Sequence, residues 1–168
     1  MRVSLYASTA TMLHNDTLRA IRYMLDLGDA KVVEIVKLAD PAYLLEKEDV
    51  QAMLLREDDP RYQTCSNTML ARFLDGLVIL RRGRDESRPP RPPEKRITNN
   101  IVLKKLRVAF ELKDVDMHAI FAEAGMPVSK PELSALFRQP EHKNYRECGD
   151  QLLRNFLKGL TLRLRGAG

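Results

Sequence analysis

The sequence contains no tryptophan, only two cysteines and few aromatic residues of any kind. Two cysteines are too few for a disulfide framework, so we expect a reducing, cytoplasmic setting. No apolar run approaches the roughly 20 residues that a membrane-spanning helix needs, and we expect no membrane association. Residues 1–11 lack the basic cluster and apolar stretch of a signal peptide. We interpret them as an unstructured extension and Met12 as an alternative start.

What the sequence does contain is an internal duplication. Residues 15–40 align with residues 100–125, and residues 50–83 align with residues 133–166. Identical residues occupy 17 of the 60 aligned positions, which is too many for two unrelated segments. The hydrophobic fraction of 44% is normal for a globular protein, so each copy can bury an aliphatic core.

Each copy is predicted to form four short helices, because apolar residues recur at helical spacing and sustained alternation is absent. The predicted fold class is all-α: a tandem repeat of two small four-to-five-helix domains. Repeat 1 covers residues 12–83 and repeat 2 covers residues 97–166. Polar residues at the expected starts of the first two helices of each copy are candidate N-caps. They are Asn15, Asn100, Asp29 and Asp114.

A proline-rich linker, residues 84–96, separates the copies. Its four prolines favour extended polyproline geometry. We interpret it as a spacer, with a basic strap across phosphates as the alternative. The formal charge is −3 over residues 1–80 and +4 over residues 97–168, which suggests that the two halves contact different partners.

Two runs of the sequence carry a family resemblance. They are NNIVLKKLR at residues 99–107 and HKNYRECGDQLLRNFLKGL at residues 142–160, and the opening MLHND at residues 12–16 agrees with them. Over about residues 12–166 the chain resembles the YehS-like family of bacterial proteins. The resemblance implies the duplicated helical architecture and no particular activity.

The order of helices in each copy is similar to a lambda-repressor-like helix-turn-helix domain, whose second and third helices form the DNA-reading motif. On that analogy residues 116–125 form the positioning helix and residues 130–138 the recognition helix. With Leu133, Leu136 and Phe137 facing inward, the outward side chains are of types that contact bases and phosphates. The predicted nucleic-acid-binding residues are Lys130, Ser134, Arg138, Gln139, His142 and Lys143.

The corresponding helix of repeat 1 runs into the acidic residues 57–59, which would repel phosphate. We therefore expect repeat 2 and the linker to carry most of any affinity for double-stranded DNA. Two alternatives stay open: an ordinary helical bundle with a solvated polar face, and a protein–protein adaptor without nucleic-acid binding. An adaptor needs an exposed apolar groove, whereas a DNA reader needs a contiguous basic face. Each of these functions is compatible with an oligomer.

The polar segment 142–150 raises the question of catalysis. Cys148 would be a nucleophile at the start of a helix, with His142 as its base. The equivalent cysteine, Cys65, has Asp59 where repeat 2 has His142, so the cysteine is retained without its partner. This favours a small packed residue, and we expect no enzymatic activity and no cofactor. We also expect no metal site, because three histidines lack ligand spacing with the cysteines: His14, His118 and His142.

Overall fold

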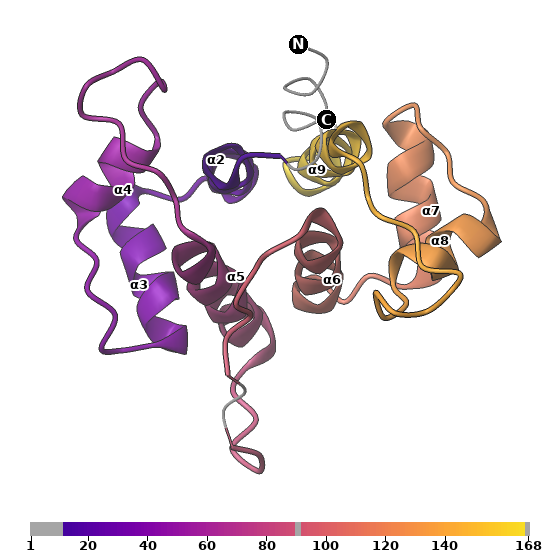
Figure 1. The fold of residues 1–168 in the computed structure, drawn as a ribbon, viewed down its shortest axis with the longest axis horizontal. Coiled ribbons are helices and arrows are strands. Elements are labelled where there is room, and N and C mark those ends of the chain that lie inside the picture. The colour runs from indigo at the N-terminus through magenta and orange to yellow at the C-terminus, as the bar shows by residue number, and fades with distance from the viewer. Residues whose placement is uncertain (1–11, 90–91, 167–168) are drawn as a thin grey trace. The chain divides into compact units, whose positions relative to one another are not determined.

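The computed structural model describes residues 12–89 and 92–166. These residues form helices and no strand, with four helices in each repeat (Figure 1). In repeat 1 they are α2 (His14–Leu25), α3 (Asp29–Ala39), α4 (Lys47–Met53) and α5 (Asn67–Arg82). In repeat 2 they are α6 (Asn99–Ala109), α7 (Asp114–Glu123), α8 (Lys130–Leu136) and α9 (Asp150–Leu164). The prediction of an all-α tandem repeat is confirmed, whereas the predicted extension over residues 1–11 lies outside the described residues.

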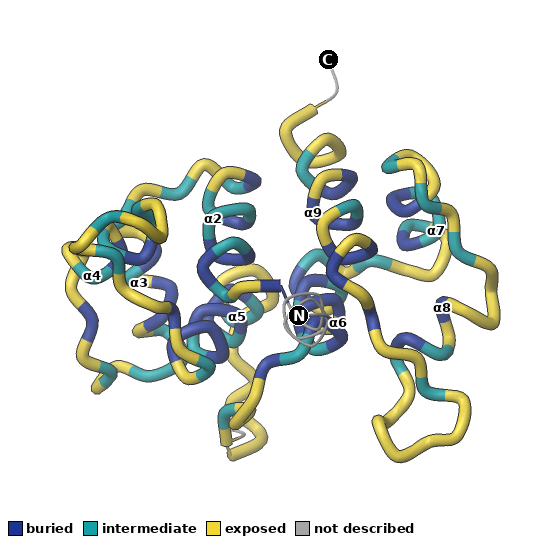
Figure 2. The backbone as a smooth tube through the Cα atoms, turned by 45° about the horizontal axis from the view of Figure 1, so that its top comes forward, coloured by how far each residue is buried: buried dark blue, intermediate teal, exposed yellow. Residues whose placement is uncertain are grey.

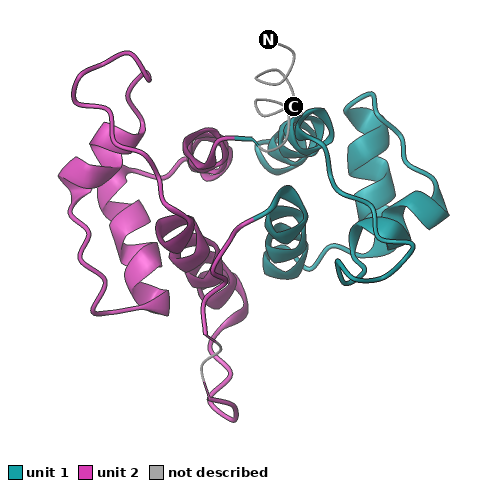
Figure 3. Cartoon of the chain, viewed as in Figure 1, with its two compact units in different colours: residues 1–12, 98–168 teal, residues 13–97 magenta. Residues whose placement is uncertain are grey.

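The chain divides into two compact units (Figure 3). Of the described residues, 13–97 form one unit, and 98–166 together with Met12 form the other. The described part of the linker is therefore grouped with repeat 1. The first linker residue, Arg84, donates a hydrogen bond of 2.8 Å to the carbonyl of Leu38 in α3. This hydrogen bond holds the start of the linker against repeat 1.

Each repeat has its own aliphatic core, to which every helix contributes one face (Figure 2). α3 packs against α5 in repeat 1, and α7 packs against α9 in repeat 2. Phe73 is fully buried in repeat 1, and Phe121 and Phe156 lie 5.2 Å apart between ring centroids in repeat 2. Because tryptophan is absent, leucine and isoleucine fill most of the remaining space.

The paired helices approach closely at a glycine that both repeats share. A Cβ atom on Gly76 of α5 would lie 1.8 Å from the carbonyl oxygen of Ile35. A Cβ atom on Gly159 of α9 would lie 2.7 Å from the carbonyl oxygen of Ile120. Glycine is therefore required at these crossings because no side chain fits between the backbones.

The prediction that asparagine and aspartate cap the first two helices is wrong. Leu13 and Thr98 precede α2 and α6, so Asn15 and Asn100 lie in the first turn of each helix. Gly28 and Lys113 precede α3 and α7, which makes the two aspartates the first helical residues. Asp29 and Asp114 instead form ion pairs with Arg22 and Arg107, respectively.

The third helix of repeat 2 begins as a capping box predicts. The Ser129 hydroxyl accepts from the backbone N–H of Glu132, and the Glu132 carboxylate accepts from the backbone N–H of Ser129. The helix ends at Leu136, two residues before the predicted end at Arg138. A longer helix is disfavoured because Pro140 has no N–H to donate to the Leu136 carbonyl, which instead accepts a hydrogen bond from the side chain of Asn100.

Candidate nucleic-acid interface

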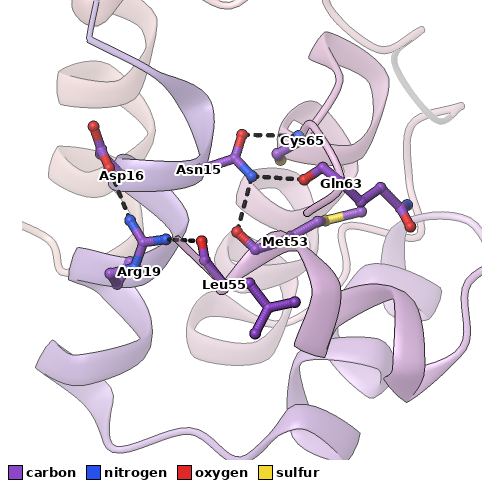
Figure 4. A network of polar contacts seen from close by, with 7 residues as sticks. All are labelled: Asn15, Asp16, Arg19, Met53, Leu55, Gln63 and Cys65. Atoms are coloured by element: carbon purple, nitrogen blue, oxygen red, sulfur yellow. Dashed lines mark hydrogen bonds and ion pairs between the residues drawn. The ribbon is translucent and has the colours of Figure 1, made fainter. Parts of the chain in front are cut away.

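The centre of repeat 1 is a buried asparagine that joins three backbone groups (Figure 4). The amide nitrogen of Asn15 donates to the carbonyls of Met53 and Gln63, each at 2.8 Å. Its amide oxygen accepts from the backbone N–H of Cys65 at 2.9 Å. One side chain therefore fixes both ends of the loop formed by residues 54–62, which we call clamped loop 1.

Repeat 2 contains the same arrangement. Asn100 donates to the carbonyls of Leu136 at 2.9 Å and Arg146 at 2.8 Å. It accepts from the backbone N–H of Cys148 at 2.8 Å. The loop closed in this way, residues 137–145, is clamped loop 2. Compact loops whose ends are held together are a frequent setting for binding functions.

The two clamped loops also share their internal hydrogen bonds. The backbone N–H groups of Tyr62 and Tyr145 donate to the carbonyls of Asp59 and His142 at 2.9 and 3.0 Å. The carboxylate of Asp59 accepts from the backbone N–H of Arg61, and the Nδ1 atom of His142 accepts from that of Asn144. A histidine ring thus replaces a carboxylate at one turn without changing the backbone pattern.

The side chains that these loops expose differ in how their charges are paired. In clamped loop 1, Arg56 pairs with Asp58 at 3.3 Å and Arg61 pairs with Asp59 at 3.0 Å. The hydrogen bond from Arg61 lowers the pKa of the Asp59 carboxyl, so this pair stays charged and mutually neutralised. In clamped loop 2 the partner is not a carboxylate: an Arg138 nitrogen lies 3.3 Å from Nε2 of the His142 ring.

All six residues predicted to bind nucleic acid are exposed. Two of them, Lys130 and Ser134, lie on α8. The other four belong to clamped loop 2, and among them the structure brings Arg138 and His142 together. An ion pair of 2.9 Å between Arg146 and Glu132 joins the end of the loop to α8. The residues predicted to lie inward, Leu133, Leu136 and Phe137, are buried or half-buried.

Sequence reasoning missed one further cation, Lys104 of α6. Its counterpart in repeat 1, Arg19, bonds to Asp16 at 2.8 Å and to the carbonyl of Leu55 in clamped loop 1 at 3.2 Å (Figure 4). Repeat 2 has Ile101 at the position of Asp16, and no acidic group among the described residues pairs with the exposed Lys104. The equivalence of Lys104 to Arg19 becomes evident only when the two clamps are compared.

The two repeats differ in the pairing of their cations. In the described part of repeat 1, ion pairs engage most of the basic residues: Arg19, Arg22, Lys31, Arg56, Arg61 and Arg72. In repeat 2, ion pairs engage Arg107, Arg146 and Arg163. Exposed cations of repeat 2 with no acidic partner among the described residues are Lys104, Lys113, Lys130, Arg138, Lys143, Arg154 and Lys158.

The cysteines that follow the clamps are buried and unreactive in character. Burial raises the pKa of Cys65 and of Cys148 to about 12, so both remain protonated thiols. A protonated, buried thiol is a poor nucleophile, which argues against the pairing of Cys148 with His142 for catalysis. Within residues 12–89 and 92–166 no cluster of three or more potential metal ligands is found. Among the described helices, none is long and apolar enough to cross a membrane.

Comparison with known sequences shows the family of this chain. The family described as "Protein of unknown function (DUF1456)" matches residues 14–83 and again residues 99–166, one match in each repeat. The chain belongs to the DUF1456 family. "Uncharacterized protein YehS" of Escherichia coli (strain K12) is 48% identical over 152 residues, which cover 90% of this chain and 96% of the relative. The resemblance to YehS-like proteins is thereby confirmed, and the two DUF1456 matches agree with the duplication. No solved structure matches the chain.

Proposed function

We propose that repeat 2 binds double-stranded DNA through α8 and clamped loop 2. The contacting residues are those named from the sequence, joined by Lys104: Lys130, Ser134, Arg138, Gln139, His142 and Lys143. The proposal assigns no catalytic step and places the protein in the cytoplasm with the DNA. The observation that carries it is the larger set of exposed cations without a described acidic partner in repeat 2, whereas in repeat 1 most of the described cations are ion-paired.

Charge pairing decides whether a lysine or arginine is available to a phosphate. A cation without an acidic partner releases counterions from DNA when it binds, and no protein ion pair has to be broken first. Residues 130–146 carry four basic and two acidic residues, whereas the equivalent residues 47–63 carry three basic and five acidic ones. The same structural region therefore attracts phosphate in one repeat and repels it in the other.

The types of exposed side chain also suit DNA. Arginine can bind guanine, glutamine can bind adenine, and serine and lysine contact phosphates and base edges. Arg138 and Gln139 follow directly on the last turn of α8, and Lys130 opens its first turn. This favours a role in regulating genes, as a helix-turn-helix-like protein whose third helix is followed by a binding loop.

The test is a salt series with random duplex DNA labelled for fluorescence anisotropy. Affinity should rise steeply as salt falls from about 200 to about 50 mM, since phosphate contacts are screened at the higher concentration. Arg138→Ala should weaken binding severalfold, whereas Arg56→Ala, in clamped loop 1 of repeat 1, should leave it unchanged. Affinity that does not tighten at low salt, or equal losses in the two variants, would contradict the proposal.

A protein–protein adaptor is the second candidate, and one feature of repeat 1 favours it. A hollow of about 370 Å³ on this repeat is lined by Val33, Leu38 and Leu80 together with Lys31, Glu34 and Lys37. Pockets of this volume accept a small ligand or a few side chains, which is less than a partner helix occupies. The adaptor predicts no binding to duplex DNA at any salt concentration, so the same titration separates the two functions.

A further inference from the structure

The two clamped loops share the same backbone hydrogen bonds and differ in their side chains. The same asparagine closes each loop, and the same backbone bond joins residue 63 to residue 52 and residue 146 to residue 135. The loops have equal length, and the turn in each is made by the side chain at the same position, Asp59 or His142. What differs between them is the set of groups that they expose.

From this correspondence we propose that clamped loop 2, and not α8, is the element that holds the DNA phosphates. Asn100 is its positioning residue. The inference rests on the proposed function and deepens it by assigning the contact to an exchangeable loop. Recognition is then of the duplex backbone, with Arg138 and Lys143 as the main contacts. Lys104 of α6 joins them because its counterpart, Arg19, bonds to clamped loop 1.

The exposed surface of α8 is poorly suited to phosphate. The helix has only seven residues, and its exposed charges are Lys130 and Glu132. Hydrogen bonds from Ser129 lower the pKa of Glu132, so this carboxylate stays negative near neutral pH. This carboxylate pairs with Arg146 at 2.9 Å, so Lys130 is the single cation that α8 itself offers to a phosphate.

Clamped loop 2 offers two cations against the single lysine of α8, and each element carries one acidic residue. Arg138 and Lys143 are exposed and have no acidic partner among the described residues, and Glu141 is the loop's single carboxylate. Because Asn100 already fixes both ends, binding need not order the loop, and less conformational entropy is lost. In clamped loop 1 the equivalent framework carries two internal ion pairs, which leave no cation for a ligand.

The equal length of the loops permits an exchange experiment in the full chain. One chimera carries, at residues 138–144, the amino acids found at residues 55–61, and the reciprocal chimera carries the opposite exchange. The clamps, the tyrosines and Phe137 stay in place, so the helical circular dichroism and the unfolding midpoint should change little. The first chimera should lose at least about tenfold in affinity for random duplex DNA. The slope of the logarithm of its affinity against the logarithm of salt concentration should become less negative by about two. The reciprocal chimera should gain affinity.

A matched pair of clamp variants tests the positioning role. Asn100→Ala and Asn15→Ala remove the same three hydrogen bonds from the two repeats, so both should lower the unfolding midpoint by similar amounts. Only Asn100→Ala should weaken DNA binding, measured below both unfolding transitions. Equal binding losses would assign the asparagine a merely structural role and overturn this part of the proposal.

Each remaining outcome separates the loop proposal from the proposed function. If the wild-type chain does not bind duplex DNA more tightly at low salt, the proposed function itself fails. If the first chimera keeps its affinity while Lys130→Ala loses it, DNA binding stands and the loop proposal is overturned. If a chimera does not fold, Arg138→Ala combined with Lys143→Ala gives the same decision, with Arg56→Ala combined with Arg61→Ala as the control.

Discussion

At the residue scale the side chains with the strictest hydrogen-bonding requirements are Asn15 and Asn100. Each uses its amide nitrogen to donate twice and its amide oxygen to accept once, so only a side chain with both functions satisfies the site. An aspartate could accept from the cysteine N–H but could not donate to the two carbonyls. An unsatisfied buried group costs about 1–3 kcal/mol, which explains why both copies need the same residue there.

The cysteines beside the clamps give a prediction about pH. The thiols have a raised pKa of about 12 in the folded protein and an ordinary pKa of 9.0 when unfolded. Between these values the unfolded state binds fewer protons, so the free energy of unfolding should fall as pH rises from about 9 towards 12. Urea unfolding at several pH values measures this decline. It should be smaller in the variant carrying Cys65→Ala and Cys148→Ala, and an equal decline in both proteins would contradict the assignment.

At the element scale the fold depends on close contact between helices at Gly76 and Gly159. In an unobstructed helix, alanine in place of glycine stabilises by about 1 kcal/mol. Here the added Cβ would meet a backbone carbonyl, at 1.8 Å for Gly76 and at 2.7 Å for Gly159. A backbone atom cannot move aside without separating the helices, so the gain in propensity is overcome.

We therefore predict that Gly76→Ala destabilises the protein by about 2 kcal/mol or more. Gly159→Ala should destabilise it less, because its Cβ is less obstructed. Thermal unfolding followed by circular dichroism measures both changes. A raised unfolding midpoint for Gly76→Ala would mean that α3 and α5 do not approach as closely as described.

At the scale of the whole molecule the two repeats share a framework and divide their surface chemistry. Arg19 is held by Asp16 and a loop carbonyl in repeat 1, whereas the equivalent Lys104 has no acidic partner among the described residues. Duplication allows this division, because one copy can keep a neutral surface while the other changes its exposed residues.

The salt dependence of DNA binding should report this division directly. If Lys104, Arg138 and Lys143 each neutralise one phosphate, the logarithmic slope should be about −3. Lys104→Ala should reduce its magnitude by about one, while Lys37→Ala in repeat 1 should leave it unchanged. A slope that is unaffected by Lys104→Ala would remove this residue from the interface.

Much of the architecture follows from the sequence alone. The duplication is evident because both copies must bury the same apolar faces, and the capping box at Ser129 is local chemistry that needs no tertiary contact. All six candidate binding residues are exposed, but the helix expected to present Arg138 and Gln139 ends at Leu136, and four of the six lie in clamped loop 2.

Only the tertiary structure places four of these binding residues on a loop that a buried asparagine closes. Asn15 and Asn100 have the local pattern of helix caps, yet they bind backbone groups between 36 and 50 residues away. Such long-range partners leave no mark on a neighbouring residue, so the clamped loop could not be foreseen. The end of α8 had a local signal in Pro140, which has no N–H to continue the helix. The sequence by itself determined two helical repeats of opposite charge. The long-range hydrogen bonds of one buried amide in each repeat decided that these charges lie on closed loops, because only the folded chain brings an amide to three distant backbone groups.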